Sequence, residues 1–198
     1  MGGALALAAV TAVLKHRLDN GLAAAGVTGE LGGEATVSAL PPDRIPSGAD
    51  ERAQLNLFLY LVTPHPTLRK NGAANGGRPF AVDLHYLLTA YGAQDYHTEI
   101  LLGHAMELLH AAPVMERDAI RTTLKALARS RDRRAVAPAL TALGASDLPD
   151  RVERIKIEPE FLEAEEVSRI WSALQARYRP SATYKVSAVV LDPGPGDR

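Results

Sequence analysis

Two long, mostly apolar stretches constrain the fold of this chain more than any other feature of its sequence. In AQLNLFLYLV, residues 53–62, leucines occupy every second position from 55 to 61, and mostly apolar residues fill the positions between them. A period of two is typical of a β-strand, and apolar residues on both faces indicate that both faces are covered. We therefore expect a central strand here, and a second strand at FAVDLHYLLTAYG, residues 80–92.

The segment that joins these two strands, TPHPTLRKNGAANGGRP at 63–79, is too long for a tight hairpin turn and is rich in Gly, Asn and Pro. Loops of this length are uncommon in compact domains and are usually either functional or disordered. This one carries three cations, Arg69, Lys70 and Arg78. It is therefore a candidate binding segment.

Shorter patterns on either side predict further strands and several helices. Apolar residues at three- and four-residue steps indicate an amphipathic helix at 4–19 that extends as far as Ala25. The remaining expected elements are strands at 34–40, 151–159 and 184–191 and helices at 97–111, 116–129, 134–143 and 163–178. They predict one α+β domain over residues 1–198, with a central, largely antiparallel or mixed sheet of about five strands flanked by helices. Residues 193–198 are expected to form a flexible tail.

The composition excludes several classes of function. The chain has no cysteine, which rules out disulfides, thiolate nucleophiles and cysteine-ligated metals. Its 22 basic and 23 acidic side chains give a net charge of -1, so no global field attracts nucleic acid or an anionic membrane. The apolar segment 4–14 resembles a signal-peptide core, but its basic residues follow it, so we interpret it as a folded helix in a cytoplasmic protein.

The stretch HTEILLGHAMELLH, residues 97–110, contains the only pattern that suggests a metal site. On a helix, His97 and His104 face within about 20° of each other, but leucines share that stripe and His110 lies further round. The zincin pattern of two histidines four apart is absent. We therefore predict no metal, no cofactor and no catalytic residue, and keep a metal-dependent enzyme that uses this helix as an alternative.

Two other features have a functional and a structural interpretation. RSRDRR, residues 129–134, has arginines able to contact phosphates, so a nucleic-acid-binding adaptor remains a second alternative. Charge runs between helices are more often solvated, and the neutral total argues against nucleic acid as a partner. Trp171 lies near Ile170 and Leu174 on the late helix, where we expect it to pack in the core.

Taken together and in this order, three stretches resemble the cap proteins of extracellular contractile injection systems, which are phage-tail-like particles. They are LNLFLYLVTPHPTLRK at 55–70, RPFAVDLHYLLTAYGAQ at 78–94 followed by LLGHAMELLHAAPV, and SRIWSALQARYRPSATYKVSAVVLD at 168–192. The similarity runs from about residue 4 to 193. It is weakest at 116–148, which looks like a helical elaboration of the shared fold.

The resemblance implies a phage tail-terminator-like fold and a structural role without enzymatic activity. Such a cap is a homohexameric ring that closes the baseplate-distal end of the particle, stops tube and sheath polymerisation and links the inner tube protein to the sheath protein. No contact with nucleic acid or membrane is implied, and the particle is assembled in the cytoplasm before any release. Because a ring needs complementary faces and loops beside sheet edges suit such contacts, we expect interface residues at Arg69, Lys70, Arg78, Arg177, Tyr178 and Arg179.

Overall fold

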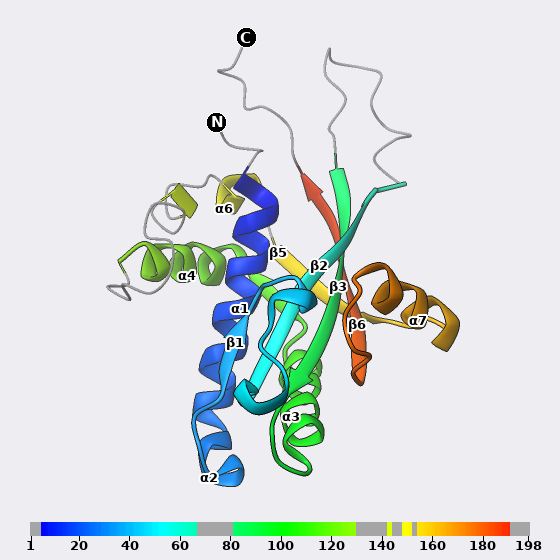
Figure 1. The fold of residues 1–198 in the computed structure, drawn as a ribbon. Helices are drawn as coiled ribbons and strands as arrows, with labels where there is room; N and C mark the ends of the chain where they lie inside the picture. Colours follow the sequence, from blue (N-terminus) through cyan, green and yellow to red (C-terminus); the bar gives the residue numbers. More distant parts are fainter. Residues whose placement is uncertain (1–4, 67–80, 130–141, 144–147, 152–153, 191–198) are drawn as a thin grey trace.

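The chain folds around one mixed sheet with helices on both faces (Figure 1). The structure, a computed structural model, describes residues 5–66, 81–129, 142–143, 148–151 and 154–190. The strands are β1 (Thr36–Ser38), β2 (Gln54–Pro64), β3 (Ala81–Tyr91), β4 (Val114–Glu116), β5 (Arg154–Glu160) and β6 (Ser181–Val190). The helices are α1 (Ala6–Ala24), α2 (Val27–Leu31), α3 (His97–Ala111), α4 (Arg117–Arg129), α6 (Leu148–Arg151) and α7 (Ala164–Ala173), with short 3-10 turns at Pro42–Arg44 and Gly48–Asp50.

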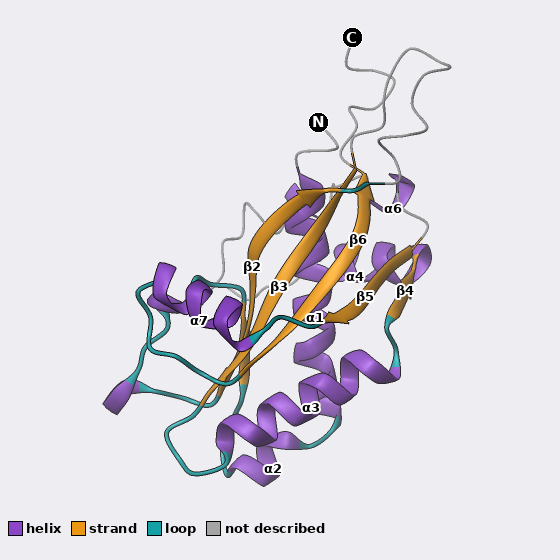
Figure 2. Cartoon of the chain, turned by 90° about the vertical axis from the view of Figure 1, so that its right-hand side faces the viewer, coloured by secondary structure: helices purple, strands orange, loops and turns teal. Residues whose placement is uncertain are grey.

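The six strands follow the order β1-β2-β3-β6-β5-β4, with β1 parallel to β2 and the other neighbours antiparallel. The predicted α+β class and mixed sheet are confirmed, but the expected number of about five strands is too low. The additional strand is β4, whose three residues follow Pro113 and show no apolar alternation. In Figure 2, β4 and β5 turn away from the three long strands, so the sheet curls.

The main core lies between α1, α3 and one face of the sheet. Residues at helical spacing on α1, among them Val10, Leu14 and Leu18, are fully buried against Leu84 and Tyr86 of β3. This burial confirms that the N-terminal apolar segment is a folded helix, and it extends through Asn20 and Gly21 as predicted. No helix among the described residues is long and apolar enough to span a membrane.

The predicted position of the 53–62 strand is only partly correct. All of β3 is buried, but β2 is covered only in its first half, and Leu61 and Val62 are 46% and 39% exposed. The cause is the shortness of β1, which pairs with β2 only from Gln54 to Asn56. Beyond Asn56, no described strand pairs with the outer edge of β2.

Where β1 ends, hydrogen bonds of the buried Asn56 side-chain amide hold the next residues of the chain beside β2. Its Oδ1 accepts hydrogen bonds from the Leu40 amide at 3.0 Å and the Ser38 hydroxyl at 2.7 Å, while its Nδ2 donates to the Leu40 carbonyl at 3.0 Å. Asn56 has no exposed surface, so these bonds satisfy a polar group that would otherwise be costly to bury. They fix residues 38–40 beside β2 without a further strand.

The second face of the sheet is covered by α7 (Figure 1). Trp171 is 2% exposed there, and its Nε1 donates a hydrogen bond to the Ser181 hydroxyl at 3.3 Å, so its predicted packing role is confirmed. The predicted helix at 163–178 is too long: α7 ends at Ala173, and Gln175 adopts a positive φ of 51°. The predicted helix at 134–143 lies mostly outside the described residues.

Candidate functional site

The end of the sheet where β2 and β3 are joined carries the first group of predicted interface residues. The described chain stops after Pro66 and resumes at Ala81, so Arg69, Lys70 and Arg78 lie outside the described residues. Antiparallel pairing brings Pro64 opposite Val82, and β6 accompanies β3 up to Ala81. The 67–80 segment thus connects two strands at an end of the sheet where no described strand pairs with the outer edge of β2.

The second predicted group, Arg177 to Arg179, divides into exposed and internal side chains. Arg177 is exposed, and Tyr178 is 63% exposed, with its ring tilted against Trp171 at 6.0 Å between centroids. Arg179 instead makes a bidentate ion pair with Glu51, with both N–O distances 2.7 Å. The contribution of these three residues to an interface stays a prediction, and the structure adds an intramolecular partner for Arg179.

The Glu51–Arg179 pair ties the ends of three strands together. Glu51 precedes β2, Arg179 precedes β6, and the Arg179 guanidinium lies 5.1 Å from the ring centroid of Tyr91 at the end of β3. The Gly92 amide donates a further hydrogen bond to Glu51 at 2.9 Å. Burial raises the pKa of the Glu51 carboxyl, but the hydrogen bonds from Arg179 and Gly92 and the guanidinium charge outweigh burial, so its pKa lies below the ordinary value.

Two histidine–carboxylate pairs connect β3 to other parts of the sheet. His85 of β3 lies between the Thr63 hydroxyl of β2 and the Glu160 carboxylate of β5, at 2.8 Å from each. His65 pairs with Asp83 at 2.7 Å. The partners in each pair are distant in sequence, so no local pattern predicted these pairs.

Thr63, His85 and Glu160 follow one another in the same order as the members of a catalytic triad: a nucleophile, a base and an orienting acid. The same three groups come from three different strands and cross-link the sheet where β2 has lost its outer neighbour. Burial, together with the negative charge of Glu160, raises the pKa of Tyr60 on β2 to about 12. We interpret the cluster as a structural tie that holds the projecting strands in register.

The three histidines of α3 do not converge. His97 is 9% exposed at the start of the helix, and His104 pairs with Glu30 of α2 at 2.8 Å. His110 is exposed near the other end of the helix. Among the described residues, no group of three or more His, Asp or Glu side chains is arranged to hold a metal ion.

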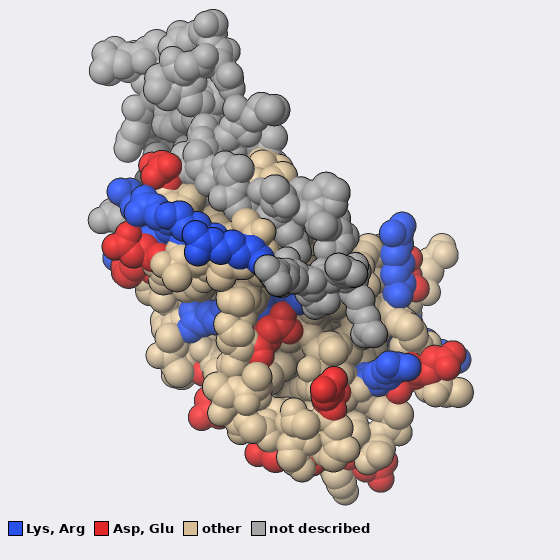
Figure 3. Space-filling view, turned by 90° about the vertical axis from the view of Figure 1, so that its left-hand side faces the viewer, with Lys and Arg blue, Asp and Glu red and all other residues tan. Residues whose placement is uncertain are grey.

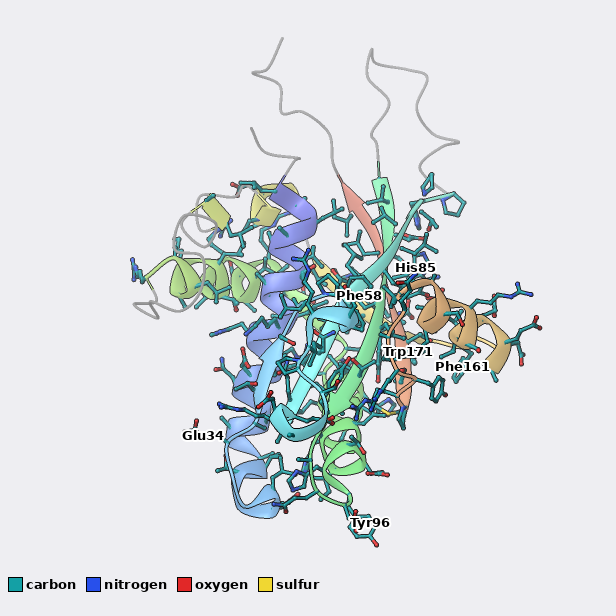
Figure 4. The ribbon with its side chains drawn as sticks, in the orientation of Figure 1. Glu34, Phe58, His85, Tyr96, Phe161 and Trp171 are labelled. Carbon is teal, nitrogen blue, oxygen red and sulfur yellow. The ribbon has the colours of Figure 1, made fainter. Side chains whose placement is uncertain are left out.

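An apolar hollow opens between the second half of α3 and β5. Its volume is about 660 Å³, and its lining includes Met106, Leu109, Ile157 and Tyr184. Phe161 stands at its border with 93% of its surface exposed, and Figure 4 shows it beside α7. Isolated exposed apolar residues are common, but a fully exposed Phe next to an apolar hollow indicates a contact surface. No pattern in the sequence around Phe161 predicts its exposure.

These features define a class of protein: an α+β domain in which, among the described residues, β2 has an unpaired outer edge and an aromatic residue, Phe161, is exposed. The chain belongs to the Pvc16 N-terminal domain family, whose model matches residues 9–197. The family predicted from the sequence is thereby confirmed. No curated protein sequence matches significantly.

One solved structure is similar in fold, and a second gives a weaker match. The first is a cryo-EM structure of the PVC sheath/tube terminator of an extracellular contractile injection system in its extended state; it has a TM-score of 0.52 at 16% identity and matches 95% of this chain and 57% of the solved chain. The second is the tube-terminating cap of the anti-feeding prophage, with a TM-score of 0.44 at 14% identity over 81% of this chain and 51% of the other. The present chain thus spans about half the length of these proteins.

Proposed function

We propose that the chain is the terminator domain of a contractile injection system, acts as a structural protein and has no enzymatic activity. Family membership supports the proposal, as does the fold shared with a sheath/tube terminator. In this role it forms a ring on the last layer of the inner tube, contacts the last layer of sheath and stops both polymers. The ring is a homohexamer assembled in the cytoplasm, and its partners are the tube and sheath proteins.

The observation that carries the proposal is the open edge of β2. From Leu57 to Pro64 the outer edge has no strand partner among the described residues, and Leu61 and Val62 are exposed there. An unpaired edge is a template for a strand from another chain, which natural proteins normally cover or interrupt. A terminator needs such a surface, because it must bind the end of a polymer.

The histidine pairs and the Asn56 amide prepare this edge for binding. They fix β2 against β3, β5 and the 38–40 segment, so the edge is ordered before a partner arrives. Ordering a strand in advance reduces the entropy lost on binding. The cations Arg69, Lys70 and Arg78 in the adjoining segment then contact acidic groups on the tube or sheath.

Charge reversal in the joining segment tests this proposal. We expect Arg69→Glu together with Lys70→Glu to weaken docking on assembled tube by at least about tenfold, because like charges then meet at the contact. The control is Arg44→Glu with Arg52→Glu, which changes the net charge equally at two exposed residues outside that segment. If the first variant caps particles of normal length and docks at wild-type affinity, the assignment of this segment is wrong.

A further inference from the structure

Four cations line one face of α4 at intervals of four residues: Arg117, Arg121, Lys125 and Arg129. Residues four apart lie on the same side of a helix, so these cations form a stripe roughly 18 Å long. The adjoining face of α4 is buried through Ile120 and Leu124. Figure 3 shows a continuous band of Lys and Arg side chains on the side of the molecule where α4 lies.

Local acidic groups neutralise only part of this stripe. Arg121 pairs with Asp118 and Asp150, each at 3.1 Å. Lys125 and Arg129 are exposed, and within the described part of the chain neither has an acidic partner. The stripe therefore keeps a positive surface available to another molecule.

A strongly acidic segment lies on the other side of the molecule. Residues 158–166, EPEFLEAEE, contain five glutamates and no basic residue. Only Glu158 and Glu165 have ion-pair partners among the described lysines and arginines, namely Lys156 at 2.7 Å and Arg169 at 2.6 Å. Phe161 lies in the middle of the segment with 93% of its surface exposed. In Figures 1 and 4, α7 and Phe161 lie on the opposite side of the sheet from α4.

We propose that α4 of one copy docks against residues 158–166 of the next copy, and that this contact builds the ring required by the proposed function on which the inference rests. A closed ring uses two different, complementary faces of each subunit, and here a positive and a negative face lie on opposite sides. The aliphatic stems of Lys125 and Arg129 cover Phe161, and their charged ends reach the surrounding glutamates. An arginine over the Phe161 ring adds a cation–π contact.

This pairing explains features that a nucleic-acid interpretation of the same cations leaves without a role. A phosphate-binding stripe needs neither the acidic segment nor an exposed Phe beside an apolar hollow. A second copy of the chain uses all of them at once. The arginine run at 129–134, the alternative nucleic-acid site, begins at the last residue of α4. Both the nucleic-acid hypothesis and the subunit-contact proposal therefore involve Arg129, and one experiment separates them.

The first test exchanges the charges. Variant A carries Lys125→Glu and Arg129→Glu, and variant B carries Glu158→Lys and Glu165→Lys. We expect each variant alone to self-associate at least about tenfold more weakly than wild type, measured by sedimentation or mass photometry with and without tube protein. An equimolar mixture of A and B restores rings, because each altered face again meets its opposite, and an alternating ring closes with six subunits. Circular dichroism and thermal melting show whether each variant is folded.

The second test uses the absence of cysteine. Lys125→Cys with Glu165→Cys is expected to form disulfide-linked multimers of the full chain under mild oxidation. The control pair, Lys125→Cys with Glu34→Cys, is not expected to do so, because Glu34 lies outside the acidic segment. The inference is overturned if variants A and B, each alone, form rings at wild-type affinity, or if the two cysteine pairs cross-link equally. The inference is also overturned if variant A loses binding to DNA while its ring formation is unchanged.

The outcomes also separate this inference from the proposed function. If wild type caps tubes and both charge variants cap them equally well, only the interface is wrong. If the A and B mixture restores rings but wild-type rings never bind tube ends, the interface stands and the terminator role fails.

Discussion

Replacing Arg179 by methionine tests most sharply how the contacts within the chain stabilise the fold. The change keeps much of the apolar stem but leaves the Glu51 carboxylate, whose side chain is 7% exposed, without its bidentate partner. Removing one member of a buried pair typically costs about 3–5 kcal/mol, because the other charge stays desolvated. For a domain of this size, each kcal/mol lowers the melting temperature by roughly 2–4 °C, so we expect a decrease of about 6–20 °C.

Arg169→Met is the matched control. Arg169 pairs with Glu165 at 2.6 Å, but both side chains are at least 75% exposed. Exposed pairs contribute about 0–1 kcal/mol, so the control is expected to melt within a few degrees of wild type. Urea unfolding of the three proteins at neutral pH gives the free-energy differences, and Glu51→Gln with Arg179→Met is expected to recover part of the loss, because no charge is then left buried.

The pH dependence of the unfolding free energy gives a second test of the Glu51–Arg179 pair. The folded-state pKa of Glu51 is depressed, so its contribution is present above the unfolded carboxyl pKa, about 4.3, and is lost as pH falls through the folded pKa. The stability difference between wild type and Arg179→Met should therefore narrow below about pH 4. A loss below about 1 kcal/mol at pH 7, or one equal to that of Arg169→Met, would refute the reasoning.

Four further substitutions probe other parts of the fold. Gly92→Ala places a Cβ 2.3 Å from the Cβ of His97, so it should destabilise the fold by about 1–3 kcal/mol. On α3, the added Cβ of Gly103→Ala meets nothing within 4 Å, so this substitution should stabilise the fold by up to about 1 kcal/mol. Thermal melts that rank the two variants in the reverse order contradict the packing described. Asn56→Ala removes the buried amide beside β1 and should cost about 2–4 kcal/mol in urea unfolding, with an effect below 0.5 kcal/mol counting against the network. His85→Leu should cost about 1–3 kcal/mol by leaving the partly buried Glu160 carboxylate without its histidine partner, and hydrogen exchange should accelerate along β2. Unchanged exchange would show that the cluster does not hold that strand.

Regular patterns with a local cause could be predicted from the sequence. The alternation in β3 and the helical spacing in α1 reflect burial on two faces and on one face, respectively, and both elements lie where the patterns place them. The helix at 97–111 was predicted with its observed ends, because Pro113 follows closely and its apolar positions recur at helical spacing.

Features that depend on distant partners could not be predicted. Whether β2 is central or an edge depends on how far β1 extends beside it, and nothing within 53–62 records that. Arg179 looks like a free cation after a helix until Glu51, 128 residues away in sequence, is placed next to it. The end of α7 at Ala173 is set by the return of the chain into β6, although the sequence up to Tyr178 keeps a helical pattern. Phe161 looked like an ordinary apolar residue because exposure has no local signature.

The measurement that tests the terminator role most directly is electron microscopy of inner tubes polymerised from purified tube protein with and without this chain. We predict a ring of density at one end only of each tube, a narrower length distribution when the chain is present from the start, and no binding along the tube wall. Tubes that elongate to the same lengths with the chain present, with bare ends or with the chain spread along the wall, would contradict the account.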